Sequence, residues 1–116
     1  MSDAQSLPEI SVSAFAQRRA EAGTALQLLD VREPQEIAIA AIPGFQVFPL
    51  SQFENWAPTL AGQLDPHAET YVICHHGMRS AQMCQWLIQQ GFTQVTNIAG
   101  GIDAYSMLVD RTIARY

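Results

Sequence analysis

The chain has 116 residues, a length typical of a single domain with one hydrophobic core. With 48% apolar and 15% charged residues it should fold into a globular domain, and no apolar run approaches the roughly 20 residues of a membrane span. The net charge of −5 argues against nucleic acid and anionic membranes as partners, and because all six basic residues are arginine, lysine-based catalysis is excluded.

The first ten residues, MSDAQSLPEI, lack the basic region and the apolar region of a secretory signal. We therefore expect a cytoplasmic protein. In that compartment its cysteines would stay reduced. Residues 1–8 are expected to form a flexible tail, and residues 9–116 a single domain.

Short apolar runs alternate along the chain with segments that carry helix signals. The first helix is expected to start at Ser11 or Ser13 and to stop near Gly23, because serine is a preferred N-cap and glycine a preferred end residue. Another is expected to run from Ser51 to about Trp56, with Pro58 limiting it and a loop over residues 61–69. The remaining helices are predicted at 32–41, 79–90 and from 102 onward, and the strands at 9–11, 25–31, 45–50, 71–74 and 93–98.

This alternation of strands and helices indicates βαβ units. Such units build a mostly parallel sheet with helices on both faces, so the predicted fold class is α/β. In an open sheet of this kind ligands bind outside the carboxyl ends of the strands.

The stretch YVICHHGMRS, residues 71–80, crosses such a strand end and concentrates reactive residue types. Cys74 stands where the strand stops, and the N-terminus of the next helix would favour negative charge beside it, which lowers a cysteine pKa. Gly77 permits a turn in which successive N–H groups point inward as an anion-binding nest. Arg79 adds a fixed charge for a sulfur or phosphorus oxyanion, whereas only one of His75 and His76 is expected to face the ligand.

Asp30 and Arg32 stand at the carboxyl end of another predicted strand and could approach the same face. For Asp30 we expect a structural role, accepting N–H bonds from neighbouring loops. Arg32 could either contact the ligand or pair with Glu33 or Glu36.

The sequence resembles the rhodanese family of sulfurtransferases from about Ile10 to Tyr105. The resemblance is carried by LLDVREPQEIAIAAIPGFQVFPL, by the loop CHHGMR followed by Ser80, and by NIAGGIDAY. It implies a rhodanese-like three-layer α/β/α fold with a mostly parallel five-stranded sheet. It also implies that Cys74 is the residue that takes up a sulfane sulfur.

Together, resemblance and residues predict a two-step cycle in which Cys74 takes sulfur from thiosulfate or a related donor and passes it to cyanide or a thiol. Neither a cofactor nor a metal is expected. The predicted catalytic residue is Cys74, and the predicted substrate-binding residues are His75, His76, Gly77, Met78, Arg79, Ser80 and Arg32, with Asp30 structural.

Two positions depart from the family pattern. Ala41 stands where a histidine is common, and Tyr105 where a tryptophan is common. Within the loop, His75 stands where a strongly basic residue is frequent, so the site carries less positive charge at neutral pH.

Other enzymatic roles fit the spacing less well. Cysteine phosphatases place five residues between cysteine and arginine, but four intervene between Cys74 and Arg79. Thiol-redox chemistry would want a second cysteine, and Cys84 shares a helix face with apolar residues, as a core cysteine does. A zinc site from Cys74, His75, His76 and His67 is disfavoured because adjacent residues rarely supply tetrahedral ligands.

A role outside catalysis stays open. The chain could be a rhodanese-like module that carries sulfur to a protein acceptor or docks with a partner. Its possession of Cys74, Gly77 and Arg79 favours activity.

Overall fold

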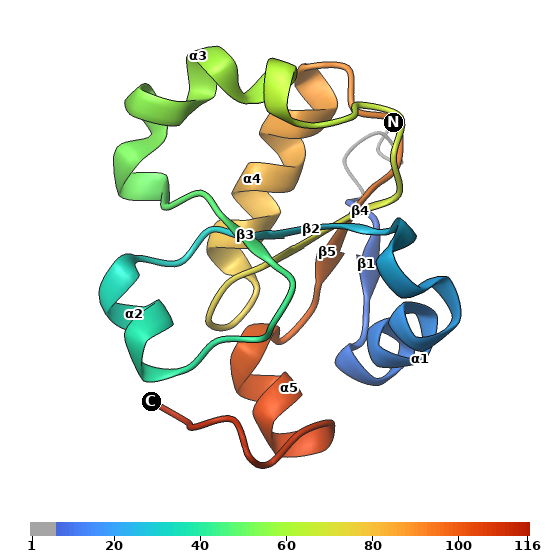
Figure 1. The fold of residues 1–116 in the computed structure, drawn as a ribbon, viewed down its shortest axis with the longest axis vertical. Coiled ribbons are helices and arrows are strands. Elements are labelled where there is room, and N and C mark those ends of the chain that lie inside the picture. The colour runs from blue at the N-terminus through green and yellow to red at the C-terminus, as the bar shows by residue number, and fades with distance from the viewer. Residues whose placement is uncertain (1–6) are drawn as a thin grey trace.

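The computed structural model describes residues 7–116, in which five parallel strands form one sheet in the order β1-β5-β4-β2-β3 (Figure 1). The strands are β1 (Glu9–Ile10), β2 (Gln27–Asp30), β3 (Gln46–Val47), β4 (Thr70–Ile73) and β5 (Val95–Ile98). The helices are α1 (Val12–Ala22), α2 (Pro34–Ile39), α3 (Phe53–Gln63), α4 (Met78–Gln89) and α5 (Gly101–Leu108), with short 3₁₀ turns η2 (Gly23–Ala25) and η3 (Leu50–Gln52). The predicted α/β class with a five-stranded parallel sheet is confirmed.

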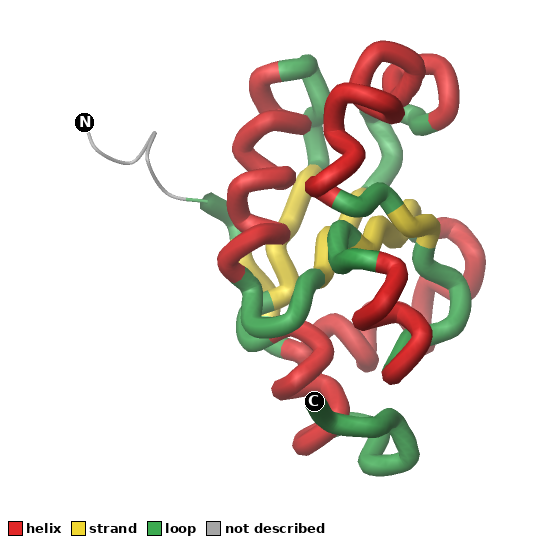
Figure 2. The backbone as a smooth tube through the Cα atoms, turned by 90° about the vertical axis from the view of Figure 1, so that its left-hand side faces the viewer, coloured by secondary structure: helices red, strands yellow, loops and turns green. Residues whose placement is uncertain are grey.

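Helices cover both faces of the sheet, so the strands form the inner layer (Figure 2). On one face Leu29 and Val72 pack with α3 and α4 residues such as Leu60 and Leu87. On the other face the core is built around Phe15 of α1 and includes residues from β2, β4, β5 and α5. Because both faces are buried, β2 and β4 read as continuous apolar runs rather than as alternating patterns.

The strand register brings the site together. Asp30 at the end of β2 lies opposite Ile73 at the end of β4, and Val72 lies opposite Asn97 of β5. The loops that follow β2, β4 and β5 therefore leave the sheet at the same edge. This is the edge at which ligands were expected.

The helix that contains Pro58 is longer than predicted. Pro58 was expected to limit it near Trp56, but α3 continues to Gln63 and takes in part of the expected loop. A proline inside a helix costs about 3 kcal/mol. The partly buried Trp56 and the buried Leu60 and Leu64 lie four residues apart on one face and pack into the core, which outweighs that cost.

One other boundary differs from the sequence expectation, and two that the sequence left open are fixed by the structure. The strand predicted at 45–50 is regular only over β3, although the N–H groups of Phe48 and Leu50 still bond to the carbonyls of Asp30 and Val31. Ser11, not Ser13, caps α1 by accepting a hydrogen bond from the N–H of Ala14 at 3.1 Å. The last helix ends at Leu108, and the chain then turns back toward the reactive loop.

The predicted tail over residues 1–8 falls mostly outside the described residues. Leu7 packs against the core, and the Pro8 carbonyl accepts a hydrogen bond from the N–H of Asn97 at 2.9 Å. Of the two departures from the family pattern, Ala41 is exposed and Tyr105 is buried in the α1–α5 face. None of the helices in the described part of the chain combines the length and the hydropathy needed to cross a membrane.

Candidate active site

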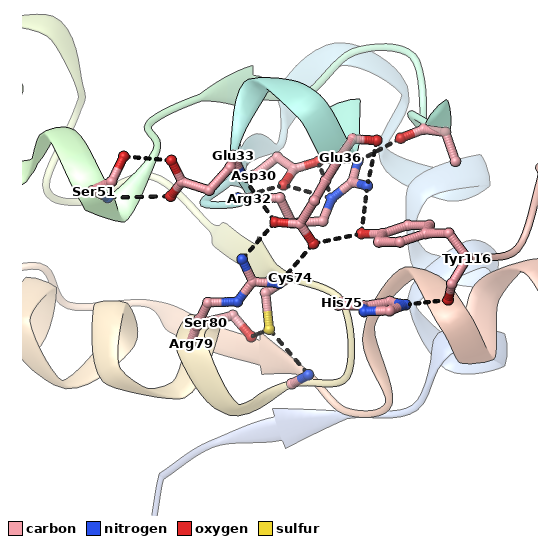
Figure 3. A network of polar contacts seen from close by, with 12 residues as sticks. Asp30, Arg32, Glu33, Glu36, Ser51, Cys74, His75, Arg79, Ser80 and Tyr116 are labelled. Atoms are coloured by element: carbon pink, nitrogen blue, oxygen red, sulfur yellow. Dashed lines mark hydrogen bonds and ion pairs between the residues drawn. The ribbon is translucent and has the colours of Figure 1, made fainter. Parts of the chain in front are cut away.

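Cys74 follows the last residue of β4 and is almost completely buried, with 1% of its surface exposed. Its sulfur accepts a hydrogen bond from the backbone N–H of Gly77 at 3.0 Å, and the Ser80 hydroxyl lies 3.3 Å away (Figure 3). Gly77 is the N-cap of α4 and has a φ of 107°, in the left-handed region that favours glycine. The sulfur therefore lies at a helix N-terminus, where backbone N–H groups and the helix dipole favour a negative charge.

A polar pair lies behind the sulfur. The buried Ser80 hydroxyl is 2.5 Å from Oδ1 of the buried Asn97, whose side-chain amide donates to the Gly77 carbonyl at 3.0 Å. A hydroxyl has one proton, so Ser80 can donate either to Asn97 or to the sulfur at any moment. Asn97 also donates to Glu9 of β1, which links the reactive loop to the far edge of the sheet.

The N-terminus of α5 holds the start of the reactive loop. The N–H of Ile102 donates to the Cys74 carbonyl at 2.9 Å, and that of Asp103 to the His75 carbonyl at 3.1 Å. A Cβ atom at Gly101 would lie 2.5 Å from the Cys74 carbonyl oxygen and would also overlap His75. The double glycine of the AGG motif thus allows a close approach that no other residue permits.

A cavity of about 280 Å³ opens over the loop and is lined by Cys74, His75, His76, Met78 and Arg79. Met78 is 80% exposed at this cavity, the largest exposed fraction among the described large apolar side chains. Five of the predicted site residues therefore meet in one space. Gly77 and Ser80 contact the sulfur directly, whereas Asp30 and Arg32 do not line the cavity.

Arg79 reaches the cavity as one half of an ion pair. Its two terminal nitrogens donate to the two carboxylate oxygens of Glu36 in α2, at 2.6 and 2.9 Å (Figure 3). Hydrogen bonding from Arg79 holds the pKa of Glu36 at about 2, and the same contact raises the pKa of Arg79 above its usual value. Both groups are therefore charged at neutral pH, and the pair has no net charge.

Arg32 is fully buried and has a structural position. Its guanidinium donates to both carboxylate oxygens of Asp30, the closest contact being 2.8 Å, and to the Ala40 carbonyl, also at 2.8 Å. Asp30 also accepts from the Arg32 backbone N–H, which fits the structural role predicted for it. Because Arg32 is enclosed and paired, its burial argues against the predicted contact with a ligand.

The two histidines stack on each other and on Tyr116. The ring centroids of His75 and Tyr116 are 3.9 Å apart at an interplanar angle of 8°, and those of His75 and His76 are 4.0 Å apart at 29°. His75 Nε2 lies 2.9 Å from the backbone oxygen of Tyr116, and the exposed His76 lies 3.7 Å from Asp103. His75 is thus held by the C-terminal residues, while His76 is more open to solvent.

His75, His76 and Asp103 form the group of possible metal ligands found among the described residues, with ligand atoms within 4.8 Å of one another. An imidazole binds a metal in the plane of its ring. Since the two rings are stacked nearly parallel, their in-plane lone pairs run side by side rather than converging. This arrangement does not fit a shared metal ion.

Two residues of the network around Arg79 were missed by sequence reasoning. Glu36 was considered only as a partner for Arg32, and Tyr116 was not considered at all. The Tyr116 hydroxyl donates to Glu36 at 2.8 Å and accepts from Arg32 at 3.0 Å. The motif around Glu36 carried a signal, since an acid one turn into a helix after a strand end lies at the ligand edge of the sheet. Tyr116 carried none.

Cys84 is a fully buried residue of α4, and both cysteines are free. It belongs to the same core cluster as Cys74, because α4 runs back over the sheet from the loop. Burial raises the pKa of the Cys84 thiol to about 12, with a smaller contribution from the charge of Cys74. Cys84 is therefore an uncharged thiol at neutral pH, as expected of a core cysteine.

Comparison with known proteins gives a consistent picture. The family model of the Rhodanese-like domain matches residues 11–108. The chain is 56% identical over 90 residues to Rhodanese-like/PpiC domain-containing protein 12, chloroplastic, of Arabidopsis thaliana, a match that covers 78% of this chain and 30% of that protein. It is 39% identical over 100 residues to the putative sulfur carrier protein YrkF of Bacillus subtilis, covering 86% of this chain and 51% of that protein.

The chain thus spans about a third and about half of the lengths of these two curated relatives. Among solved structures, the human single-domain sulfurtransferase TSTD1 superposes with a TM-score of 0.72 at 25% identity. That match covers 89% of this chain and 98% of the human one.

Proposed function

Because the chain belongs to the rhodanese-like domain family, we propose that it is a sulfurtransferase that carries a sulfane sulfur on Cys74 as a persulfide. The observation that carries this proposal is the buried Cys74 sulfur, which accepts the Gly77 N–H at the N-terminus of α4. Such a position stabilises a thiolate before reaction and a persulfide anion after it.

In the first half of the cycle the Cys74 thiolate attacks the outer sulfur of thiosulfate. The sulfur–sulfur bond of thiosulfate breaks, its electron pair leaves with sulfite, and Cys74 becomes a persulfide anion. In the second half cyanide or a thiolate attacks the outer sulfur of the persulfide. Thiocyanate or a new persulfide leaves, and the Cys74 thiolate is restored without an external oxidant or reductant.

The other residues of the cavity would bind the donor. Arg79 keeps N–H groups that Glu36 does not use, and these would meet the oxygen atoms of the donor. His76 is the more accessible imidazole for the same purpose, because His75 is engaged by Tyr116. The N–H groups of the first turn of α4 would hold the terminal sulfur of the persulfide.

A second candidate function is that of a sulfur carrier for a protein acceptor. The same persulfide would form, but a protein rather than cyanide or a small thiol would remove the sulfur. Met78 favours this reading, because a flexible apolar side chain that is 80% exposed beside a reactive site suits contact with a protein surface. The cytoplasmic location expected from the sequence stays a prediction, as does the proposed absence of nucleic acid and membrane partners.

Phosphatase activity is less well supported. The loop has one residue fewer between Cys74 and Arg79 than a phosphate-binding loop of this type, and its arginine is already paired with Glu36. A phosphoryl group needs more positive charge than a loop whose arginine is already paired supplies.

Mass spectrometry of the protein after incubation with thiosulfate tests the proposal. We expect a one-sulfur adduct on Cys74 that cyanide removes, no adduct in Cys74→Ser, and an unchanged adduct in Cys84→Ser. An adduct that needs Cys84 would overturn the assignment of Cys74. Turnover of a phosphate ester in the absence of any sulfur adduct would favour the phosphatase instead.

A further inference from the structure

The fixed charges at the cavity are balanced. Among the residues that line the cavity, Arg79 carries the permanent positive charge. Both of its terminal nitrogens donate to the Glu36 carboxylate, at 2.6 and 2.9 Å. The Arg79 and Glu36 side chains are 35% and 18% exposed, so solvent screens the pair only in part. A donor that enters the cavity therefore meets a guanidinium that is already paired with a carboxylate, rather than a free positive charge.

Glu36 is itself held from behind by Tyr116. The Tyr116 hydroxyl donates to the same Glu36 oxygen that accepts from Arg79, and it accepts a hydrogen bond from Arg32 at 3.0 Å (Figure 3). Arg32 is fully buried and bonded to Asp30, so it is a rigid anchor. The chain of contacts from Arg32 through Tyr116 and Glu36 to Arg79 fixes the carboxylate in place beside the cavity.

Met78 gives the cavity an apolar surface in addition to these charged groups. Its exposed thioether side chain offers apolar surface at the same cavity. A donor with an apolar end could contact this surface, whereas the sulfonate end of thiosulfate could not.

Building on the sulfur transfer proposed above, we propose that Glu36 and Tyr116 are specificity-determining residues of this site. They keep Arg79 paired, so that the site favours a singly charged sulfane-sulfur donor with an apolar end over doubly charged thiosulfate. Organic thiosulfonates and alkyl persulfides share this chemistry.

The physical reason is the second negative charge of thiosulfate. One charge would be met by the N–H groups at the N-terminus of α4, but Arg79, which would meet the other, is already paired with the Glu36 carboxylate. Methanethiosulfonate has the same sulfur–sulfur bond, with a methyl group in place of one charged oxygen. When the Cys74 thiolate attacks its outer sulfur, the sulfur–sulfur bond breaks, methanesulfinate leaves with the electron pair, and Cys74 becomes the same persulfide anion.

The test compares kcat/KM for thiosulfate and for methanethiosulfonate, with cyanide as the acceptor. We expect the wild-type protein to prefer methanethiosulfonate and Glu36→Gln to shift the ratio toward thiosulfate by about tenfold, mainly through the KM of thiosulfate. Glutamine keeps an acceptor for the Glu33 N–H at the start of α2, so the helix cap survives. Tyr116→Phe should shift the ratio in the same direction by about threefold, because it removes one hydrogen bond that holds Glu36.

Glu33→Gln is the matched control. Glu33 lies at the start of the same helix and accepts hydrogen bonds from Ser51 rather than from Arg79. Its substitution removes the same charge, and we expect the donor ratio to stay unchanged. An equal shift in Glu33→Gln, or no shift in Glu36→Gln, would overturn the proposal.

The outcomes separate this proposal from the one on which it rests. If neither donor leaves a sulfur adduct on Cys74, the sulfur transfer itself is wrong. If both donors load Cys74 but Glu36→Gln and Tyr116→Phe keep the wild-type ratio, only the specificity role is wrong. An alkyl persulfide as a third donor then shows whether the preference extends from sulfonyl donors to persulfides.

Discussion

At the scale of single residues, Ser80 offers the sharpest test of how the loop supports the sulfur. Its hydroxyl lies 3.3 Å from the Cys74 sulfur and 2.5 Å from Asn97 Oδ1, and all three side chains are buried. We predict that Ser80→Ala slows alkylation of Cys74 by iodoacetamide at neutral pH about threefold, because a hydrogen-bond donor to the sulfur is lost. It should also lower the free energy of unfolding by about 1–2 kcal/mol, since Asn97 loses a hydrogen-bond partner.

Ser51→Ala is the control for that experiment. Ser51 is exposed, and its hydroxyl bonds to Glu33 rather than to the sulfur. It should leave the alkylation rate unchanged, whereas an unchanged rate in Ser80→Ala would remove Ser80 from the set of groups that stabilise the sulfur. Peptide mapping separates the two cysteines, and Cys84 should stay unmodified because its pKa is raised to about 12.

At the scale of secondary-structure elements, the contact between α5 and the reactive loop depends on Gly101. Its φ is 61°, and a Cβ atom there would overlap the carbonyl oxygens of Cys74 and His75. We predict that Gly101→Ala costs about 3 kcal/mol in urea unfolding, from steric overlap and a strained backbone, and abolishes most sulfur transfer by displacing the loop.

Gly62→Ala provides the matched comparison within a helix. Gly62 lies in α3, has no positive φ, and a Cβ atom there would contact nothing within 4 Å. The same substitution should therefore stabilise the protein by about 0.5–1 kcal/mol and leave activity unchanged. A similar loss of stability in both variants would contradict the role given to Gly101.

At the scale of the whole molecule, ion pairs between distant segments make the free energy of unfolding depend on pH. Glu69, just before β4, accepts two hydrogen bonds at 2.8 Å from Arg18 of α1 and one at 2.6 Å from Tyr71. Hydrogen bonding from Arg18 lowers the pKa of Glu69 from 4.5 to about 2. The folded form thus binds a proton less readily than the unfolded chain, so this stabilisation is complete above pH 4.5 and is lost as the pH falls toward 2.

We therefore predict that the free energy of unfolding falls between pH 4.5 and pH 2, and that Glu69→Gln makes the fall smaller by about 1 kcal/mol. The figure is discounted for solvent screening, since the Arg18 and Glu69 side chains are 41% and 28% exposed. Urea titrations at several pH values measure it. Glu54→Gln, at an exposed position of α3, should leave this fall in the free energy of unfolding the same as in the wild type.

How much could be predicted from the sequence depends on the distance between interacting residues. Cys74, Gly77 and Arg79 lie within six residues, so their spacing after an apolar run was enough to place them at a strand end and a helix start. Glu36 and Arg79 are 43 residues apart, and Tyr116 lies 80 residues from Glu36, so only the folded chain brings them together. Pro58 led to a wrong helix end because the local rule that proline ends a helix was overridden by burial of the apolar face of α3.

The hydrogen bonds that tie the loop to α5 bear on how such a site can evolve. The N–H groups of Ile102 and Asp103 donate to two consecutive carbonyls, those of Cys74 and His75. Gly101 packs so closely against the same carbonyls that the loop cannot shift toward α5. Within that fixed frame, one extra residue before Arg79 would push the arginine and the start of α4 out of register with Glu36 and Asn97. Lengthening the loop to phosphate-binding size is therefore not a single insertional step: α4 and its partners on α2 and β5 would have to change with it.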